Sequence, residues 1–268
     1  MRSNGKNLIS IVIPVWNEEE GIPQLHSCLM HVHELLREQG DLQFIFVDDG
    51  STDGTQQALQ TYFANEKNVL VVTHDRNRGI GAAFRSGFQA AEGDIVCTID
   101  ADCTYRPEGL KLLLASLEEN GSDIAVASPY HPLGKVEGVP YWRLALSQCC
   151  SWFYRRIAPV KLFTYTSVFR AYRRAVVETV AFRGDGFVCA SEILVLAAHQ
   201  GYRISEVPMT LHARQIGQSK MKVARTVRAH LKMMKSLAAG MLAAGFARPN
   251  VGAVKPVAAI ERSSDQAA

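Results

Sequence analysis

Short apolar runs alternate with longer amphipathic stretches along the first half of the chain. Buried β-strands are predicted by apolar runs near residues 8–15, 42–47, 68–73, 94–99 and 123–128. Helical periodicity lies between these runs, near residues 18–37, 54–65, 80–91 and 107–119. The alternation predicts an α/β fold, in which a mostly parallel, Rossmann-like sheet is flanked by helices on both faces.

The second half of the pattern is less regular. Prolines and glycines between residues 129 and 140 predict a loop ahead of an aromatic-rich helix from Tyr141 to Ile157. A long loop in a compact domain is often a lid or a binding loop. A last helix is predicted from Met221 to Leu237, and the composition of residues 249–268 predicts a disordered tail.

The composition fits one enzyme-sized domain, because 268 residues of which 47% are hydrophobic can bury a substantial core. The six cysteines show no C-x-x-C spacing, so we expect reduced core residues of a cytoplasmic chain rather than a zinc or disulfide framework. No apolar run reaches the ~18 residues that span a bilayer. Pro14 and the acidic residues 18–20 follow the first apolar run at once, which indicates a strand rather than a signal peptide.

Charge is distributed unevenly along the chain. After Glu206 there are ten Lys or Arg and two acids, giving +8, whereas the first 206 residues hold 19 basic and 24 acidic residues, giving −5. A helix in the basic part would carry four cations on one face, namely Arg225, Arg228, Lys232 and Lys235, beside an apolar face. Such a helix is typical of an anionic membrane surface, but a core-packed terminal helix with a solvated basic face is the alternative.

Two carboxylates, Asp100 and Asp102, directly follow the apolar run that ends at Ile99. In a parallel sheet, ligands bind in the crevice beyond the carboxyl ends of the strands. Mg²⁺ and Mn²⁺ prefer carboxylate oxygens and usually bridge to substrate phosphates. The pair therefore indicates a metal site and a phosphorylated substrate, although an aspartate at a strand end can also be a turn or helix-cap residue.

Three more segments carry candidate site residues. The first apolar run ends in Pro14, Trp16, Asn17 and Glu18, and the second ends in Asp48 and Asp49. Paired acids after a strand can hold a ribose or a base edge. The glycines of residues 77–87 are interpreted as a device for close packing of a helix on the sheet rather than as a phosphate cradle. No G-x-G-x-x-G or G-x-x-x-x-G-K-[ST] motif is present, which disfavours a dinucleotide cofactor and a P-loop ATPase.

Together, these four segments resemble the family-two glycosyltransferases of the GT-A fold. The resemblance covers roughly residues 8–235, and it continues at residues 166–174, 186–194, 206–208 and 214–221. The order of these motifs resembles the dolichol-phosphate or polyprenyl-phosphate mannosyltransferase branch, whose members move a sugar from a nucleotide onto a polyprenyl phosphate. It implies a GT-A domain over residues 1–220 and a C-terminal amphipathic, membrane-associated helix over residues 221–248.

The resemblance also implies a role for each candidate residue. It implies an inverting reaction, with mannose from GDP-mannose as the expected donor and with Mg²⁺ or Mn²⁺ on Asp100 and Asp102. Thr104 stands where related enzymes carry a Gln ligand, so the third protein ligand stays open. The donor would be bound by Pro14, Trp16, Asn17, Glu18 and Asp48 or Asp49. The phosphate of the acceptor would be bound by Arg143 and Ser147. Further catalytic residues would be Arg214, Lys220 and Glu192.

The acceptor is less closely defined. The family often has an Arg where this chain reads residues 128–131, so His131 or Lys135 would substitute for it. A phosphate acceptor needs no strong base because it is already nucleophilic at pH 7. A sugar or lipid hydroxyl would need one, and Asp185 or Glu192 are the candidates.

Three alternatives remain beside the polyprenyl-phosphate transferase: a family-two transferase acting on a hydroxyl, a nucleotidyltransferase, and a non-catalytic nucleotide-sugar-binding protein. A nucleic acid partner is not expected. An acceptor with a lipid tail favours the membrane interpretation of the basic helix, so the resemblance implies a cytoplasmic protein that associates peripherally with anionic membranes.

Overall fold

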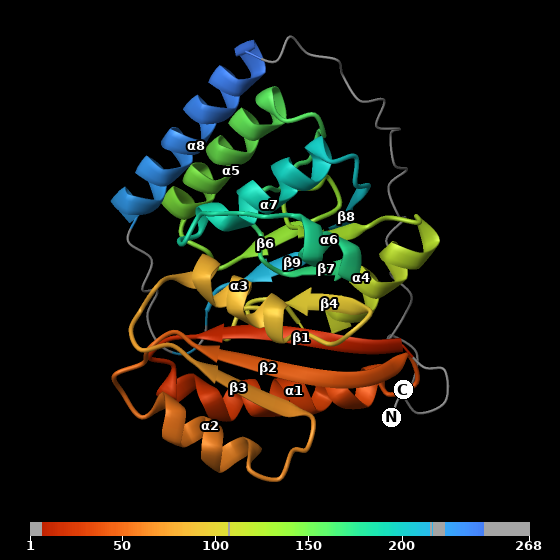
Figure 1. Cartoon of the computed structure of the whole chain (residues 1–268), viewed down its shortest axis with the longest axis vertical. Coiled ribbons are helices and arrows are strands. Elements are labelled where there is room, and N and C mark those ends of the chain that lie inside the picture. Colours follow the sequence, from red (N-terminus) through yellow and green to blue (C-terminus); the bar gives the residue numbers. More distant parts are fainter. Residues whose placement is uncertain (1–6, 107, 215, 217–222, 244–268) are drawn as a thin grey trace, which may run out of the picture.

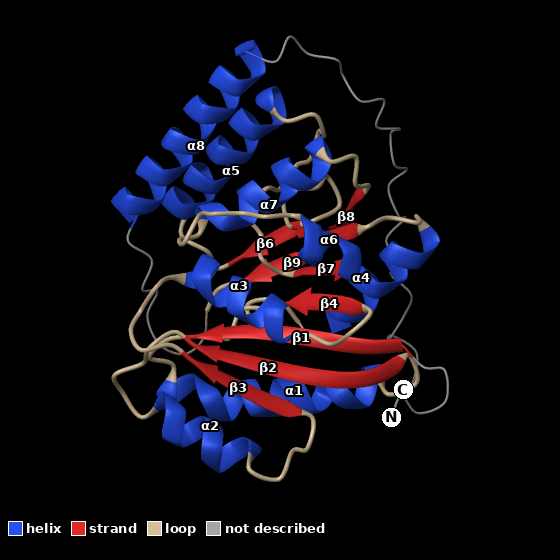
Figure 2. Cartoon of the chain, viewed as in Figure 1, coloured by secondary structure: helices blue, strands red, loops and turns tan. Residues whose placement is uncertain are grey.

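A seven-stranded sheet runs through the centre of the molecule, and helices cover both of its faces (Figures 1 and 2). The computed structural model describes residues 7–106, 108–214, 216 and 223–243. The strands of this sheet are β1 (Asn7–Val15), β2 (Gly40–Asp48), β3 (Val69–Thr73), β4 (Ile95–Thr98), β5 (Ile124–Ser128), β7 (Arg170–Arg173) and β8 (Ile204–Pro208). Their order is β3-β2-β1-β4-β7-β5-β8, and every neighbouring pair is parallel except the two that involve β7.

The helices are α1 (Ile22–Leu36), preceded by the 3₁₀ turn η1 (Glu19–Gly21), α2 (Thr55–Phe63), α3 (Ile80–Ala90), α4 (Glu108–Glu119), α5 (Tyr141–Ile157), α6 (Arg174–Thr179), α7 (Val188–His199) and α8 (Val223–Ala243). A two-stranded parallel sheet of β6 (Lys135–Glu137) and β9 (Thr210–His212) lies outside the main sheet. The five predicted strands and four predicted helices are confirmed, with ends that differ by at most four residues. The helix predicted at 141–157 is confirmed, whereas Met221 and the predicted tail at 249–268 lie outside the described residues.

The central strands are buried on both sides, which is why they read as continuous apolar runs. On one side, Ile9, Ile11 and Ile13 of β1 pack with the buried residues of α1, α2 and α4. On the other side, Val12 belongs to a cluster built from α3, α5 and α7. Gly87 of α3 lies against this residue, since a Cβ added at Gly87 would be 2.2 Å from Val12 Cγ1. The close-packing interpretation is therefore confirmed for Gly87.

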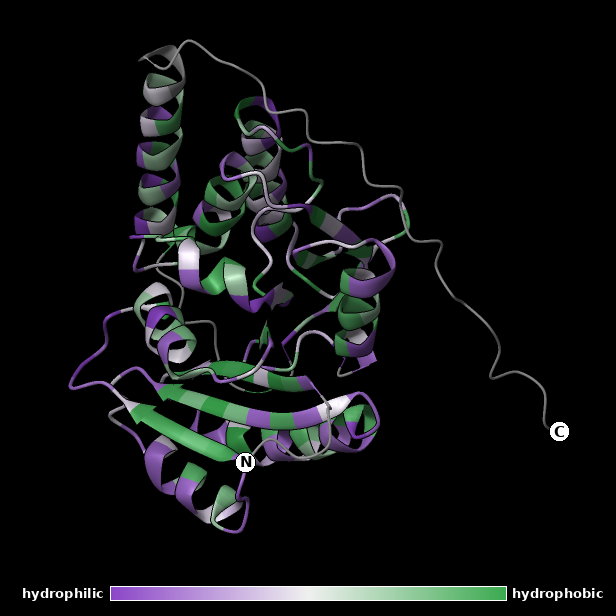
Figure 3. Ribbon diagram, turned by 45° about the vertical axis from the view of Figure 1, so that its right-hand side comes forward, coloured by the Kyte–Doolittle hydropathy of each residue, from purple (hydrophilic) through white to green (hydrophobic). Residues whose placement is uncertain are grey.

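Helices α5 and α8 lie side by side at the end of the molecule farthest from β3 (Figure 1). Tyr154 of α5 is fully buried, and its hydroxyl is 2.9 Å from Nδ1 of the buried His230 of α8. Burial lowers the pKa of His230 to about 4, so the ring is neutral at pH 7. Hydrophilic and hydrophobic residues alternate along α8 (Figure 3), as the amphipathic pattern of the sequence predicts.

Arg170, the first residue of β7, is completely buried. Its guanidinium donates to the backbone carbonyls of Ala190 (2.7 Å) and Tyr165 (3.0 Å), which ties β7 to α7 and to the segment before the strand. None of the ion pairs found among the described residues involves Arg170. This cation is therefore held by backbone oxygens in the interior.

Replacing Arg170 by Ala should destabilise the fold strongly, because two buried carbonyls lose their donors and a cavity remains. We expect Arg170→Ala to lower the free energy of unfolding by ~3 kcal/mol in urea titrations. Arg76→Ala is the control, since that side chain is 80% exposed and its loss should change the value by less than ~0.5 kcal/mol. Equal stabilities of the two variants would contradict this role of Arg170.

The buried His230 should make the stability depend on pH. Its folded pKa of about 4 lies below the ~6.5 of an exposed histidine, so its contribution is fully present above about pH 6.5 and is lost as the pH falls towards 4. We expect this one residue to remove ~3 kcal/mol of the free energy of unfolding between pH 7 and pH 4. Urea titrations of His230→Asn across that range should give a flatter profile than wild type. Parallel profiles would show that His230 does not titrate in this way.

Candidate functional site

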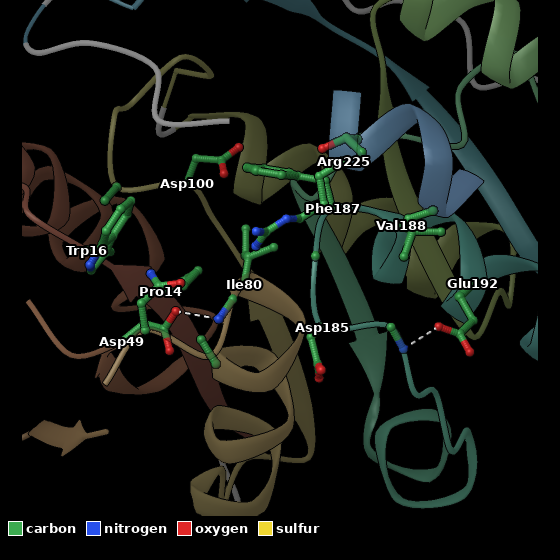
Figure 4. Close-up of a pocket in the computed structure, with 18 of the residues that line it drawn as sticks. Pro14, Trp16, Asp49, Ile80, Asp100, Asp185, Phe187, Val188, Glu192 and Arg225 are labelled. Atoms are coloured by element: carbon green, nitrogen blue, oxygen red, sulfur yellow. Dashed lines mark hydrogen bonds between the residues drawn. The ribbon is translucent and has the colours of Figure 1, made fainter. Parts of the chain in front are cut away.

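Two cavities meet at the carboxyl end of β4. The larger has a volume of about 1150 Å³ and the smaller one of about 560 Å³. Figure 4 shows residues that line the larger cavity. Both cavities are lined by Asp100, Asp102, Arg143, Phe187, Arg214 and Thr226. These shared residues mark the place where a molecule in one cavity can reach a molecule in the other.

The two aspartates form a strongly electronegative site. Burial raises the pKa of Asp100 well above its ordinary value, and the charges of Asp102 and Glu18 raise it further, while Arg214 acts in the opposite direction. The chain turns just after the pair, because Cys103 has a left-handed backbone conformation with φ of 51°. A cation between the two carboxylates would offset their repulsion.

Mg²⁺ or Mn²⁺ fits this donor set, since both are hard cations that take carboxylate oxygens and leave other positions to substrate oxygens. Among the described residues, no group of three or more His, Cys, Asp or Glu side chains could hold a metal ion. The part of the chain that the structure describes therefore offers two carboxylates rather than a complete cage. Thr104 lines the smaller cavity, and its backbone N–H donates to Asp102 Oδ1 at 3.3 Å.

Arg214 connects the segment after β9 to the segment after β1. Its guanidinium forms an ion pair with Glu18, and both side chains are largely shielded from solvent. Its Nε also donates to the carbonyl of Ile216 at 2.6 Å. The predicted partner of Arg214 in catalysis, Lys220, lies outside the described residues.

The predicted donor-binding residues fall into two groups. Those that line the larger cavity are Pro14, Trp16, Glu18 and Asp49. The other two, Asn17 and Asp48, are not among its lining residues and instead hold the loops after β1 and β2 together. The backbone N–H of Asn17 donates to Ser51 Oγ (2.9 Å), its Oδ1 accepts from the Thr52 N–H (2.7 Å), and Asp48 Oδ1 accepts from the Ser51 N–H (2.9 Å).

Asp49 is buried and holds the start of α3 (Figure 4). Its Oδ1 accepts from the Arg78 N–H at 2.9 Å, and its Oδ2 accepts from the Gly79 N–H at 2.7 Å. The ring of His74 adds a contact of 2.7 Å through Nδ1. A carboxylate with these partners shapes the cavity wall that a donor would meet.

The two predicted base candidates are both engaged in holding the loop before α7. Asp185 forms an ion pair with Arg85 of α3. Glu192 accepts from the backbone N–H groups of Arg183 (3.1 Å) and Gly184 (2.7 Å), and Figure 4 shows it in the cavity wall beside this loop. Each carboxylate thus has a partner within the protein.

The glycines of α3 allow that loop to approach. The Gly81 N–H donates to the carbonyl of Asp185 at 2.7 Å. A Cβ at Gly81 would lie 1.9 Å from the Gly184 carbonyl oxygen, and one at Gly79 would lie 2.3 Å from that of Asp185. Glycine at both positions is therefore required for the loop to form this wall of the cavity.

The predicted acceptor-phosphate residues come together in the smaller cavity. Arg143 and Ser147 both line it from α5, and Ser147 Oγ is 2.6 Å from the hydroxyl of Thr166. Nε of Arg143 is buried and has no hydrogen-bond partner among the described residues, so this donor remains available for an anion. Beyond this polar end, the lining is largely apolar and includes Val139, Leu144, Leu146, Leu211, Val223 and Val227.

Neither predicted substitute for the family's acceptor arginine reaches this place. His131 packs edge-on against Phe163, with ring centroids 5.3 Å apart, and Lys135 is in β6. Neither residue lines either of the two cavities. Burial also lowers the pKa of His131, which disfavours the cationic form.

Sequence reasoning missed several lining residues. Those of the larger cavity include Asn77, Arg183, Phe187, Arg225 and Lys232. The last two were assigned to the membrane-facing stripe of the predicted helix. Their spacing of seven residues puts both on one helix face, but only the packing of α8 on α5 determines where that face points.

The comparisons with known proteins agree with this geometry. A model of the family described as glycosyl transferase family 2 matches residues 10–181. A polyprenol monophosphomannose synthase of Mycolicibacterium smegmatis is 33% identical over 222 residues, which are 79% of this chain and 80% of that protein. A dolichol-phosphate mannosyltransferase of Pyrococcus furiosus is 33% identical over 80% of this chain, and a dodecaprenyl-phosphate galacturonate synthase of Rhizobium johnstonii is 30% identical over 84%. The chain spans only 59% and 65%, respectively, of these last two proteins.

Solved structures share the architecture. Glucosyl-3-phosphoglycerate synthase from Mycobacterium tuberculosis in complex with phosphoglyceric acid superposes with a TM-score of 0.67 and 19% identity, covering 87% of this chain and 80% of that one. The same enzyme in complex with Mn²⁺, UDP and glucosyl-3-phosphoglycerate gives a TM-score of 0.64 at 20% identity, covering 85% of this chain and 80% of that one. These structural similarities confirm the predicted GT-A fold, and the sequence matches establish the family. The chain belongs to glycosyl transferase family 2, and it is a glycosyltransferase.

Proposed function

We propose that this glycosyltransferase moves a sugar from a nucleotide sugar to a polyprenyl phosphate, with inversion at the sugar carbon and with Mg²⁺ or Mn²⁺. GDP-mannose is the proposed donor, because two of the relatives are named for mannose transfer. The observation that carries the proposal is the meeting of the two cavities at Asp100, Asp102, Arg143 and Arg214. One cavity has the size and polar groups for a nucleotide sugar, and the other joins an anion site to an apolar channel.

The donor would occupy the larger cavity. Trp16 offers a ring to the base, and Asp100 and Asp102 would hold the metal ion beside the diphosphate. When bound, such an ion neutralises charge on the nucleoside diphosphate as it leaves. A solved structure of glucosyl-3-phosphoglycerate synthase contains Mn²⁺ together with UDP, which supports a metal ion beside the diphosphate in this proposal. Lys220, which would join Arg214 at the diphosphate, stays a prediction.

The acceptor would occupy the smaller cavity, with its phosphate at Arg143 and Ser147. An acceptor oxygen attacks C1 of the sugar, the bond from C1 to the diphosphate oxygen breaks, and the nucleoside diphosphate leaves with the electron pair. A cavity of about 560 Å³ holds only the first part of a polyprenyl chain. The rest would leave along α5 and α8, which both supply lining residues to this cavity.

The state of the base candidates favours a phosphate acceptor over a hydroxyl. Asp185 is paired with Arg85, and both oxygens of Glu192 accept backbone hydrogen bonds. A hydroxyl acceptor needs a free base within reach of its proton, whereas a phosphate is nucleophilic at neutral pH without one. Glu192 therefore supports the loop of the donor cavity in this proposal.

Membrane association is the second part of the proposal. No helix among the described residues has the length and apolarity to cross a bilayer. Helix α5 nevertheless exposes large apolar side chains, with Tyr141 90%, Trp142 49%, Trp152 52% and Phe153 45% exposed. Aromatic residues of this kind favour the interface between lipid headgroups and acyl chains. Arg228 and Lys235 are exposed on α8 beside them, which fits peripheral association with an anionic surface.

The transfer reaction can be tested directly with labelled GDP-mannose, polyprenyl phosphate and Mn²⁺, followed by solvent extraction of the lipid product. We expect label in the lipid fraction, its loss in EDTA, and a decrease of at least ~100-fold in kcat/KM for Asp102→Asn. Glu119→Gln removes the same charge from the exposed end of α4 and serves as the control. Undiminished transfer in EDTA would exclude the metal role, and transfer only to hydroxyl acceptors would exclude the phosphate acceptor.

Membrane association can be tested by sedimentation with vesicles that contain phosphatidylserine. Wild type should bind at low salt, and both Trp152→Ser/Phe153→Ser and Arg228→Gln/Lys235→Gln should bind more weakly. The charge variant should lose most of its difference from wild type at high salt, because surface attraction is worth only about 1 kcal/mol per cation and is screened. If both variants sediment like wild type, these surfaces do not contact the membrane.

A further inference from the structure

Two of the four cations of the basic stripe line the larger cavity, although all four are exposed. Arg225 and Lys232 are among its lining residues, together with Thr226, Ala229, Met233 and Ser236 of the same helix. Figure 4 shows Arg225 at the cavity with Asp100 and Phe187. Arg228 and Lys235, three residues further along in each case, line neither cavity. Two cations of the stripe therefore border the site and two do not.

The position of α8 is fixed by its packing on α5. The hydrogen bond between Tyr154 and His230 joins the two helices, and Met233, Met234 and Leu237 pack against the core beside it. With His230 turned to α5, the residues at the adjoining edge of α8 must face the cavity. The cations are thus placed by the fold and not by the flexibility of their side chains alone.

Apart from the β4 pair, the acids of the cavity have partners of their own and form no ion pair with these two cations. Glu18 is paired with Arg214 and Asp185 with Arg85, while the two oxygens of Glu192 accept backbone N–H groups. None of the ion pairs found in the described part of the chain involves Arg225 or Lys232. An anion that enters between α8 and the aspartates would meet two cations with no acid partner to displace.

We infer that Arg225 and Lys232 bind phosphate oxygens of the substrates, so that α8 is a wall of the active site as well as a surface helix. The inference deepens the proposed function and rests on it for the identity of the phosphates. Arg225 directly precedes Thr226, which lines both cavities, so its place is near their junction. Arginine suits this role because its planar group can bond two phosphate oxygens at once. The phosphate belongs either to the donor diphosphate or to the acceptor.

The same helix supplies a matched control. Arg225→Gln/Lys232→Gln removes two charges from the cavity side, and Arg228→Gln/Lys235→Gln removes two from the outward side. Equilibrium binding of GDP with Mn²⁺ is one arm, and binding of a short-chain, water-soluble prenyl phosphate is the other, so that no membrane is involved. Urea unfolding of both variants checks that the fold is retained. Arg225→Lys/Lys232→Arg keeps both charges and tests whether charge is what matters.

We expect the cavity-side variant to bind at least one ligand about tenfold more weakly, since charge-assisted hydrogen bonds are lost, with less than about twofold change for the outward variant. The weakened arm identifies the phosphate, and the charge-keeping variant should bind more tightly than the cavity-side Gln variant, because both positions stay cationic. If the cavity-side and outward variants bind both ligands with equal affinity, the inference is overturned. The proposed function still stands in that case if the wild type transfers the sugar to the lipid. A wild type that neither binds these ligands nor transfers the sugar would overturn both.

Discussion

The negative charge buried at the carboxyl end of β4 is the constraint on which the site depends. Asp100 is partly buried, and burial raises its pKa well above the ordinary value, while Asp102 adds a second carboxylate beside it. Two cations that line both cavities together with the pair come from distant parts of the chain: Arg214 after β9 and Arg143 from α5. A fold that keeps two acids in this place must bring these segments together, and the meeting of the two cavities is the result.

The other acids of the site act mainly on the backbone. Asp48 accepts a hydrogen bond from a main-chain N–H of its own turn, and Asp49 and Glu192 accept them from neighbouring loops. Such bonds hold loop segments in one conformation, because these segments lack the regular backbone hydrogen bonds of a helix or a strand. The cavity walls are thus held by carboxylates, and the groups that remain open to a ligand are cations and the β4 pair.

Much of the fold follows from the sequence, because the central strands are apolar runs and the helices have a clear period. Strand β7 could not be predicted in this way, since it begins with Arg170 and is short and polar in composition. Asp100 and Asp102 could be assigned from their place after a strand. The hydrogen bonds that Asn17 and Asp48 make to the backbone could not be predicted, because the same residue types occur in turns and in ligand sites. The direction in which Arg225 points could not be predicted either, because it depends on contacts between α8 and α5 that no local sequence pattern contains.

The placement of β7 between β4 and β5 has a consequence for the order in which the molecule can assemble. Strand β5 has only β7 and β8 as neighbours, and both come later in the chain. On the ribosome, the sheet from β3 to β4 can pair as soon as it emerges, whereas β5 must wait for residues 170–208. During that interval the edge of β4 is unpaired, beside the very residues that become the reaction centre. The site residues that follow β1, β2 and β4 are thus synthesised first, and the lining residues from Arg183 onward are added later.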